Sequence, residues 1–324
     1  MTDQQANPET DCGLRVALGV GAVVGGVLLG SAVWTRWQTR RAERRHPPAG
    51  RFVDVAGGRL HYLEAGDGPP VVLIHGNSVQ ASDFEASGLF TLLAQRHRVI
   101  AFDRPGFGYS DRPAGRVWTP AAQADLLHQA LAELGVERAV VVGHSYGATI
   151  AAAMALSYPE TVRALVLLSG YYFPTPRVDA LTSALAKTPL LGGLLRHTLL
   201  PVTGRLTLPL AAKRMFAPRA VAPKFEAFVP RAMMTRPVTV GGMTGDGSLM
   251  IPGAASLARS YKRITQPVTI VTGDGDHVVS AERHSHKLHK QIPHSELRVV
   301  PHAGHMVHYA AARKISAWVE ALSD

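Results

Sequence analysis

The chain has 324 residues, of which 46% are hydrophobic, and this composition excludes global disorder. The length suits one large α/β domain with an inserted lid, or two small domains. The single cysteine, Cys12, excludes an intrachain disulfide, so the fold does not depend on an oxidising compartment. The formal net charge is +10, from 34 Lys and Arg against 24 Asp and Glu.

A large share of this positive charge lies in one short segment, at Arg36, Arg40, Arg41, Arg44 and Arg45. Such a cluster is typical either of nucleic-acid binding or of the flank of a membrane-spanning helix. An apolar run directly precedes the arginines, and no basic stripe with interleaved aromatic residues occurs elsewhere in the sequence. We therefore expect a membrane-flanking cluster, with membrane lipid as a partner and no nucleic acid.

The apolar segment over residues 14–34 carries no charge after Arg15, and its length matches that of a helix crossing a bilayer. The alternative is a cleaved signal peptide, but the positive charges follow the apolar run rather than precede it. We expect a tail over residues 1–13, a retained single-pass transmembrane helix over 14–34 and a basic linker over 35–50. Because positively charged flanks stay in the cytoplasm, the folded domain is expected on the cytoplasmic side of the membrane.

From residue 51 onward, short apolar strands alternate with helices. Strands are predicted over residues 59–65, 71–74, 99–102, 139–142, 165–168, 268–271 and 297–300. Helices are predicted over residues 119–134, 146–157, 281–291 and 306–322. This alternation predicts an α/β fold with a doubly wound, mostly parallel sheet, built from residues 51–170 and 256–324.

Residues 171–255 interrupt the alternation with several prolines and short amphipathic segments such as Pro189–Leu200. The stretch is too long for a plain loop and predicts a mostly helical cap over the sheet. It carries ten Lys and Arg against three acidic residues. A cap that is both cationic and apolar favours contact with an anionic membrane surface. In the alternative, its apolar residues pack on the core and its charges form a solvated face.

The sequence Gly143–Gly147 (GHSYG) matches the pattern G-x-S-x-G. An apolar strand runs directly into it and an Ala-rich helix leaves it, which is the context of a nucleophile elbow. In an elbow, a strained turn lifts the serine hydroxyl above the sheet, and the glycines permit close backbone approach. Ser145 is therefore the candidate nucleophile, with a serine in an ordinary turn as the alternative. The backbone N–H of Tyr146, directly after it, is a candidate oxyanion donor.

A serine hydroxyl needs a base and an oriented third group to become a nucleophile. With this motif, an acid and then a histidine are expected downstream, where strands end. Residues 273–279 (GDGDHVV) follow one predicted strand and offer Asp274 and Asp276. Residues 301–306 (PHAGHM) follow the last predicted strand and offer His302 and His305.

Five segments together resemble the α/β-hydrolase superfamily, in its branch of esterases, haloperoxidases and carbon–carbon hydrolases with a helical cap. They are HGN at 75–77, DRPGFGYS at 103–110, GHSYG at 143–147, GDGDHVV at 273–279 and GHM at 304–306. The resemblance extends from about Phe52 to the C-terminus and implies the α/β-hydrolase fold with a cap insertion. The 103–110 segment resembles a loop that supports the site, and we expect a structural role for it.

The resemblance also implies roles for individual residues. Asp276 matches the family's acid, in G-x-x-D followed by an apolar pair, with Asp274 as the rival. His305 matches the base, and Asn77 in HGN matches the second oxyanion donor. Dehalogenase-like relatives and epoxide hydrolases use an aspartate nucleophile, so Ser145 sets those two chemistries aside. No metal or organic cofactor is implied.

Five further histidines, at 284, 286, 289, 302 and 308, raise the question of a metal site. No matching set of cysteines or carboxylates accompanies them in the sequence, so we expect no metal site there. We expect His284, His286 and His289 on a solvated helix face.

These features predict a membrane-anchored serine hydrolase that cleaves a carboxylic ester, with lipophilic esters preferred over short, charged ones. A carbon–carbon bond hydrolase or a perhydrolase-like enzyme would use the same residues and stays an alternative. A non-enzymatic membrane scaffold on this fold is a further alternative, against which the intact Ser, Asp, His order argues. The sequence specifies no oligomeric state.

Overall fold

A computed structural model describes residues 8–177, 183, 186, 188 and 191–323. Eight strands form one sheet in the order β1-β2-β4-β3-β5-β6-β7-β8. The β1–β2 and β2–β4 pairs are antiparallel, and every other neighbouring pair is parallel. The strands are β1 (Arg51–Val55), β2 (Gly58–Ala65), β3 (Pro70–Ile74), β4 (Arg98–Phe102), β5 (Ala139–His144), β6 (Val162–Leu168), β7 (Val268–Gly273) and β8 (Glu296–Val300). The expected mostly parallel sheet is thereby confirmed.

The strand β1 is the one that the sequence did not predict. Its sequence, RFVDV, carries two charges among five residues and buries only Val53. It lies at the sheet edge and pairs with β2 alone. An edge strand of this kind has too short an apolar face to stand out as a periodic pattern.

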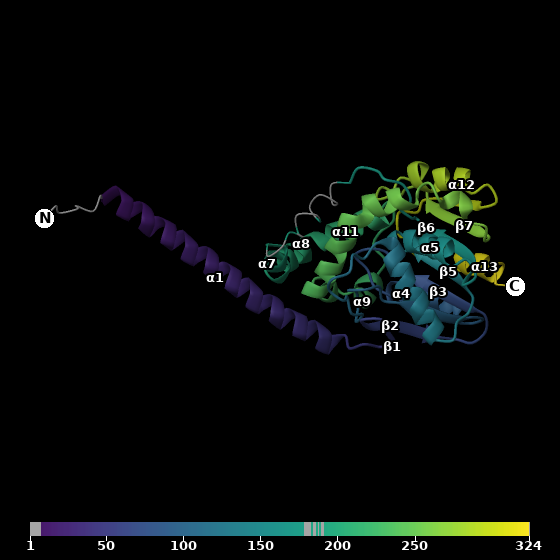
Figure 1. Cartoon of the computed structure of the whole chain (residues 1–324), viewed down its shortest axis with the longest axis horizontal. Helices are drawn as coiled ribbons and strands as arrows, with labels where there is room; N and C mark the ends of the chain where they lie inside the picture. Colours follow the sequence, from purple (N-terminus) through teal and green to yellow (C-terminus); the bar gives the residue numbers. More distant parts are fainter. Residues whose placement is uncertain (1–7, 178–182, 184–185, 187, 189–190, 324) are drawn as a thin grey trace.

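Helices cover both faces of the sheet, as a doubly wound fold requires (Figure 1). On one face pack α4 (Pro120–Glu133), α5 (Tyr146–Ser157) and α12 (Lys287–Gln291). On the other face pack α2 (Asp83–Ala86), α3 (Leu89–Leu93) and α13 (Val307–Glu320). Because β5, β6, β7 and β8 are parallel, the carboxyl ends of β5, β7 and β8 lie at the same edge of the sheet, where the loops of the candidate site follow.

The cap is mostly helical, as expected. Its described helices are α7 (Leu191–His197), α8 (Leu199–Phe216), α9 (Phe225–Phe228), α10 (Arg231–Met234) and α11 (Pro237–Leu257). Of the amphipathic segment Pro189–Leu200, the first two residues lie outside the described part. The helix α11 continues two residues beyond the expected end of the cap at 255, with Pro252 inside it.

The N-terminal helix α1 runs from Pro8 to Arg45 and projects away from the rest of the molecule (Figure 1). It is longer than the predicted transmembrane helix, because it includes most of the segment expected to be a linker. That segment holds helix-forming Arg, Ala, Glu and Gln and no Gly or Pro before Pro47, so nothing stops the helix earlier. The stretch from Leu18 to Arg45 is long and apolar enough to cross a membrane by length and composition.

The C-terminal half of α1 packs along the cap helices α7, α8 and α10. Ala42 is buried in an apolar cluster that joins α1 to cap residues such as Phe216 and Met234. The side chain of Arg236 is buried and forms an ion pair with Glu43 at 3.2 Å. The α1 helix and the cap are therefore one packed unit at this end.

Two charges of the cap are not solvated. Arg236, at the start of α11, is 2% exposed, and Asp246, within α11, is fully buried. Asp246 forms ion pairs with Arg104 and Arg112 of the core, the second at 3.0 Å. The alternative that every cap charge forms a solvated face is therefore wrong for these two residues. A buried carboxylate needs such partners, since an unpaired charge in the interior is strongly destabilising.

Candidate active site

The candidate nucleophile Ser145 sits in a sharp turn between β5 and α5. Its backbone φ is 54°, in the region that residues with a Cβ rarely adopt. A Cβ on Gly147 would lie 2.1 Å from the Ile74 carbonyl oxygen, and one on Gly143 would lie 2.5 Å from the Gly147 carbonyl oxygen. Only glycine fits at these two positions, so the motif's glycines are required by close backbone approach.

Ser145, His305 and Asp276 form a continuous hydrogen-bonded chain. His305 Nε2 lies 2.9 Å from Ser145 Oγ, and His305 Nδ1 lies 2.9 Å from Asp276 Oδ2. Ser145 follows β5, Asp276 lies in the loop after β7, and His305 lies between β8 and α13. All three residues are buried, with exposed fractions of 8% for Ser145, 9% for Asp276 and 3% for His305. The structure thus brings together the three residues that the sequence singled out.

The environment of Asp276 keeps its carboxylate ionised. Burial alone would raise its pKa, but His305 and the backbone N–H groups of Val279 and Val278 outweigh that effect and lower the pKa. Its Oδ1 accepts both of these N–H groups, at 2.9 and 2.8 Å, which leaves Oδ2 directed at His305. An ionised Asp276 favours the imidazole tautomer with its proton on Nδ1, so that Nε2 can accept a proton from Ser145. Asp274, the rival, is exposed.

The two candidate oxyanion donors lie next to the nucleophile. Tyr146 is the first residue of α5 and is fully buried. The first N–H groups of a helix have no acceptor within the helix, so the Tyr146 amide can serve a ligand. Asn77 lines the same cavity as Ser145, and its side-chain Nδ2 donates to the Met243 carbonyl oxygen at 3.2 Å. The assignment of both donors stays a proposal.

Two neighbouring cavities lie between the core and the cap. The larger, of about 660 Å³, contains Ser145 and His305, and its remaining lining residues are Asn77, Ser78, Pro176, Arg177, Ala211, Arg214, Met215, Met250 and Val278. The smaller, of about 210 Å³, lies among α8, α9 and α10 and is lined mainly by apolar residues that include Phe225 and Met234. Ser78 and Met215 belong to the walls of both cavities. The smaller cavity therefore adjoins the larger across a shared wall, and we call it the side chamber.

A buried arginine of the 103–110 segment, Arg104, fixes the loop that carries Asn77. Arg104 is fully buried and donates to the carbonyl oxygens of His75 and Gly76, at 2.9 and 3.0 Å. It also donates to Gln123 at 2.9 Å and to Asp246 of the cap. Burial and the Arg104 charge lower the pKa of His75 to about 3, so His75 is neutral and its Nε2 accepts the Arg104 backbone N–H. The expected structural role of the 103–110 segment thus has a physical basis.

The expectation for His284 is wrong. Its side chain is 2% exposed, and its Nδ1 accepts the backbone N–H of Tyr172 at 3.0 Å and that of Phe173 at 3.3 Å. Burial, followed by the charge of Arg177, lowers the pKa of His284 to about 4. His284 therefore acts as a neutral acceptor that fixes the chain at the start of the cap. His286 and His289 are partly exposed.

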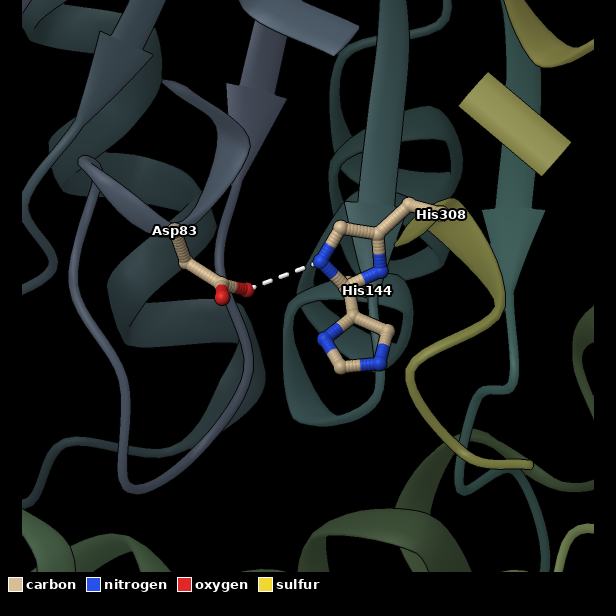
Figure 2. Close-up of side chains that lie close together, drawn as sticks. All are labelled: Asp83, His144 and His308. Atoms are coloured by element: carbon tan, nitrogen blue, oxygen red, sulfur yellow. Dashed lines mark hydrogen bonds and ion pairs between the residues drawn. The ribbon is translucent and has the colours of Figure 1, made fainter. Parts of the chain in front are cut away.

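Asp83, His144 and His308 lie together beside the nucleophile elbow, and all three are buried (Figure 2). His308 Nε2 lies 2.9 Å from Asp83 Oδ2, and one possible ligand atom of each residue lies within 4.8 Å of the others. Carboxylate oxygen and imidazole nitrogen are metal ligands. Within the part of the chain that the structure describes, this cluster has the residue types and the spacing that suit a cation. Contrary to expectation, a carboxylate accompanies His308. It belongs to Asp83, and the sequence did not indicate this pairing because the two residues lie 225 positions apart.

In the structure this cluster supports the site through hydrogen bonds. His144 Nε2 bonds to the backbone oxygen of His305 at 3.1 Å, and Tyr309 donates its hydroxyl to Asp83 at 2.7 Å. Burial and the neighbouring histidines His308 and His305 lower the pKa of His144 well below its usual value. A neutral His144 carrying its proton on Nε2 holds the loop of the candidate base in place.

Comparison with known proteins agrees with this fold. The family model described as the alpha/beta hydrolase fold matches residues 69–312, and the chain therefore belongs to the α/β-hydrolase family. The chain is 28% identical to 2-hydroxymuconate semialdehyde hydrolase of Pseudomonas putida over 280 residues, which cover 86% of this chain and 95% of that one. It is also 28% identical to haloalkane dehalogenase 2 of Mycobacterium tuberculosis over 276 residues, covering 84% of this chain and 94% of that one. The relatives indicate a hydrolase.

Solved structures share the fold. A thermophilic esterase from Thermogutta terrifontis matches with a TM-score of 0.70 and 21% identity, over 85% of this chain and 100% of that one. A membrane phospholipase A, described as a bacterial virulence factor, matches with a TM-score of 0.67 and 23% identity. That match covers 98% of this chain and 99% of the other, so it extends into the N-terminal helix α1.

The geometry around His305 predicts that the two neighbouring aspartates differ sharply in importance. We expect Asp276→Asn to lower kcat by roughly 10³- to 10⁴-fold, because an amide no longer favours the Nδ1–H tautomer of His305. Asp274→Asn changes an exposed side chain and should alter kcat less than about threefold. The measurement is hydrolysis of a p-nitrophenyl ester by the full chain in detergent. Equal losses from the two variants, or a larger loss from Asp274→Asn, would reverse the assignment of the acid.

Proposed function

We propose that the protein is a serine hydrolase that transfers the acyl group of a carboxylic ester to water. The observation that carries this proposal is the chain of hydrogen bonds from Ser145 through His305 to Asp276. His305 Nε2 removes the Ser145 proton as Oγ attacks the ester carbonyl carbon, and the imidazolium then protonates the departing alcohol. Water attacks the resulting acyl-enzyme, again with His305 as base, and releases the carboxylic acid and free Ser145.

The backbone N–H groups of Tyr146 and Asn77 are proposed to stabilise the negative oxygen that forms in both steps. Donors fixed in advance at this position are usually the largest single contribution to acyl transfer. Arg104 supports the second donor, because it holds the carbonyl groups of the preceding His75 and Gly76. The proposed reaction calls for no metal or organic cofactor.

A carbon–carbon bond hydrolase is the second candidate, since the chain is similar to 2-hydroxymuconate semialdehyde hydrolase over most of its length. It would use the same three residues, and the fold does not distinguish between the two reactions. The similarity to a haloalkane dehalogenase does not extend to its chemistry in our proposal, because a serine stands at the position of the nucleophile. A non-enzymatic scaffold is disfavoured by a hydrogen-bonded triad that opens into a cavity.

Replacement of the nucleophile tests the central proposal. Ser145→Ala should lower ester hydrolysis by at least roughly 10³-fold while leaving the melting temperature nearly unchanged. The matched control is Ser169→Ala, which changes another buried serine with a positive φ, directly after β6, and should retain activity within about threefold. The measurement is kcat for a p-nitrophenyl ester, together with thermal unfolding of both variants. Persisting ester hydrolysis by pure Ser145→Ala would sink the proposal.

We further propose that α1 anchors the protein in a membrane and that the cap faces the lipid. Ser31 Oγ donates to the Thr198 carbonyl oxygen at 2.7 Å, and Arg205 lies over the Trp34 ring at 5.6 Å. The expected transmembrane segment over residues 14–34 reaches roughly 31 Å at 1.5 Å per residue, enough for a hydrocarbon core of about 30 Å, and these contacts lie at its C-terminal end. The junction of α7 and α8 would therefore lie at the membrane surface.

The outer face of α7 and α8 suits that position. Leu206 and Leu210 are 77% and 72% exposed, and Leu194 and Leu199 are also exposed. Basic residues accompany them along the same helices, at Arg196 and Arg205. Exposed leucines among cations are typical of helices that lie in the interface of an anionic bilayer. A cap in contact with lipid and an apolar side chamber support a lipophilic ester as the substrate.

Chain-length dependence tests the lipophilic substrate. The full chain should cleave octanoate esters with a higher kcat/KM than acetate esters, because a longer acyl chain fills the apolar side chamber. Leu206→Asp/Leu210→Asp should lower hydrolysis of esters in anionic vesicles by roughly tenfold and leave soluble octanoate ester hydrolysis little changed. A higher kcat/KM for acetate would contradict the apolar pocket. Equal vesicle activity of the double variant would contradict the lipid-facing cap.

We propose that the folded domain lies in the cytoplasm, because the arginine cluster at residues 36–45 follows the apolar part of α1. The prediction concerns reporters fused to the C-terminus in a bacterial host. A green fluorescent protein fusion should fluoresce, and an alkaline phosphatase fusion should be silent. Replacing Arg40, Arg41, Arg44 and Arg45 by Glu reverses these charges and should weaken this orientation. If the green fluorescent protein fusion does not fluoresce and the alkaline phosphatase fusion is active, the folded domain lies outside the cytoplasm.

A further inference from the structure

A further cavity, of about 430 Å³, lies between α1 and the cap. Its α1 wall is formed by residues between Ala32 and Arg40, and its cap wall by His197 and Pro237. His197 ends α7 and Pro237 begins α11, so three helices line the cavity. It shares no lining residue with the two cavities near Ser145, and the proposed acyl transfer does not use it. Its volume is typical of a small-molecule site.

The α1 wall of this cavity is cationic. Arg36 and Arg40 both line it. They are four residues apart, so they lie on the same face of the helix with Cβ atoms roughly 6 Å apart. Neither forms an ion pair or a hydrogen bond with a residue that the structure describes. The acidic residue nearest to them in α1, Glu43, pairs with Arg236 of the cap. Two like charges at one cavity attract an anion.

A buried hydroxyl on the same wall also lacks a partner. Thr35 lines the cavity and is 2% exposed, and its Oγ1 has no hydrogen-bond partner among the described residues. Buried polar groups normally have partners, so an unpaired hydroxyl in a cavity wall points to a ligand. On the cap wall, His197 Nδ1 donates to the Gly193 carbonyl oxygen at 2.8 Å, which leaves Nε2 as the ring nitrogen that a ligand can use.

The position of the cavity along α1 matches the surface of a bilayer. Ala32 and Val33 are an apolar part of the wall and lie at the end of the expected transmembrane segment 14–34. At 1.5 Å per residue, Arg36 and Arg40 lie roughly 3 and 9 Å beyond that segment, and helical side chains lean toward the N-terminus, here toward the bilayer. The headgroup layer on one side of a bilayer is about 5 to 8 Å thick. With α1 inserted as proposed, both guanidinium groups are therefore level with the headgroups.

We infer that this cavity binds an anionic phospholipid, with the phosphate between Arg36 and Arg40 and the first part of the acyl chains against Ala32 and Val33. Guanidinium forks suit phosphate oxygens, and basic pockets beside a membrane helix on the cytoplasmic side bind lipid phosphates. A zwitterionic headgroup fits less well, because its cation would lie near the same two arginines. The inference rests on the proposed anchoring by α1 and deepens it, because it names the lipid class that the anchor holds.

Binding of lipids that cannot be hydrolysed tests the site. The full chain in nonionic detergent is titrated with ether-linked phosphatidylglycerol and, separately, with ether-linked phosphatidylcholine, neither of which has an ester bond between glycerol and its chains. Native mass spectrometry counts the bound lipids and gives a Kd for each. We expect phosphatidylglycerol to bind with a Kd roughly tenfold below that of phosphatidylcholine. An equal concentration of glycerol 3-phosphate should not displace it, because that compound has no chains to place against the apolar wall.

The double variant Arg36→Gln/Arg40→Gln should bring the ratio of the two Kd values close to one. The matched control Arg44→Gln/Arg45→Gln removes two exposed charges from the same helix outside the cavity and should keep the native ratio. A native ratio near one, a preference that survives in Arg36→Gln/Arg40→Gln, or an equal loss in the control would overturn the inference. Displacement by glycerol 3-phosphate would overturn the lipid as the occupant.

Failure of the proposed anchoring gives a different result. In that case an alkaline carbonate wash would release the full chain from cell membranes. If the chain stays in the membrane pellet and yet binds the two lipids equally in detergent, the anchoring holds and the lipid site alone is wrong.

Discussion

The strained turn at Ser145 is the constraint around which the site is arranged. A positive φ at a residue with a Cβ persists only where the surrounding structure holds it, and here β3, β5 and α5 approach so closely that Gly143 and Gly147 leave no room for a side chain. The same approach places the first N–H of α5 beside the serine and directs the hydroxyl above the sheet. The loops after β7 and β8 then bring Asp276 and His305 within hydrogen-bond distance of one another and of Ser145.

The surroundings of the site rest on buried polar groups that join distant segments. Arg104 and Asp246 tie the loop of Asn77 to the cap, so the cap is held at the site by a charged contact as well as by apolar packing. His144 holds the backbone of His305. Groups of this kind are costly to bury unless they are paired, which explains why each has a partner in the interior. The N-terminal helix α1 packs on the same cap, so this helix, the cap and the cavity form one continuous structure.

Much of the fold could be predicted from the sequence, because seven strands are apolar runs bounded by turns and the motifs follow them directly. The three residues of the triad stand in local motifs, so they could be singled out before the structure placed them together. Contacts between distant segments could not be predicted. The pairing of Asp83 with His308, the burial of His284 and the ion pair of Asp246 with Arg104 depend on tertiary packing that no local pattern encodes. The edge strand β1 and the helical continuation to Arg45 lacked a periodic apolar signal.

We propose that one serine, Ser145, is activated by its neighbours and carries the chemistry, and the position of a covalent adduct distinguishes it from every other serine of the chain. The full chain in detergent would be treated with a fluorophosphonate, which reacts with activated serine hydroxyls, and digested for peptide mass spectrometry. We expect one adduct per chain, on the peptide that contains Ser145, with labelling slowed strongly in Asp276→Asn. An adduct on another serine, or an unlabelled Ser145 in a protein that still hydrolyses esters, would contradict it.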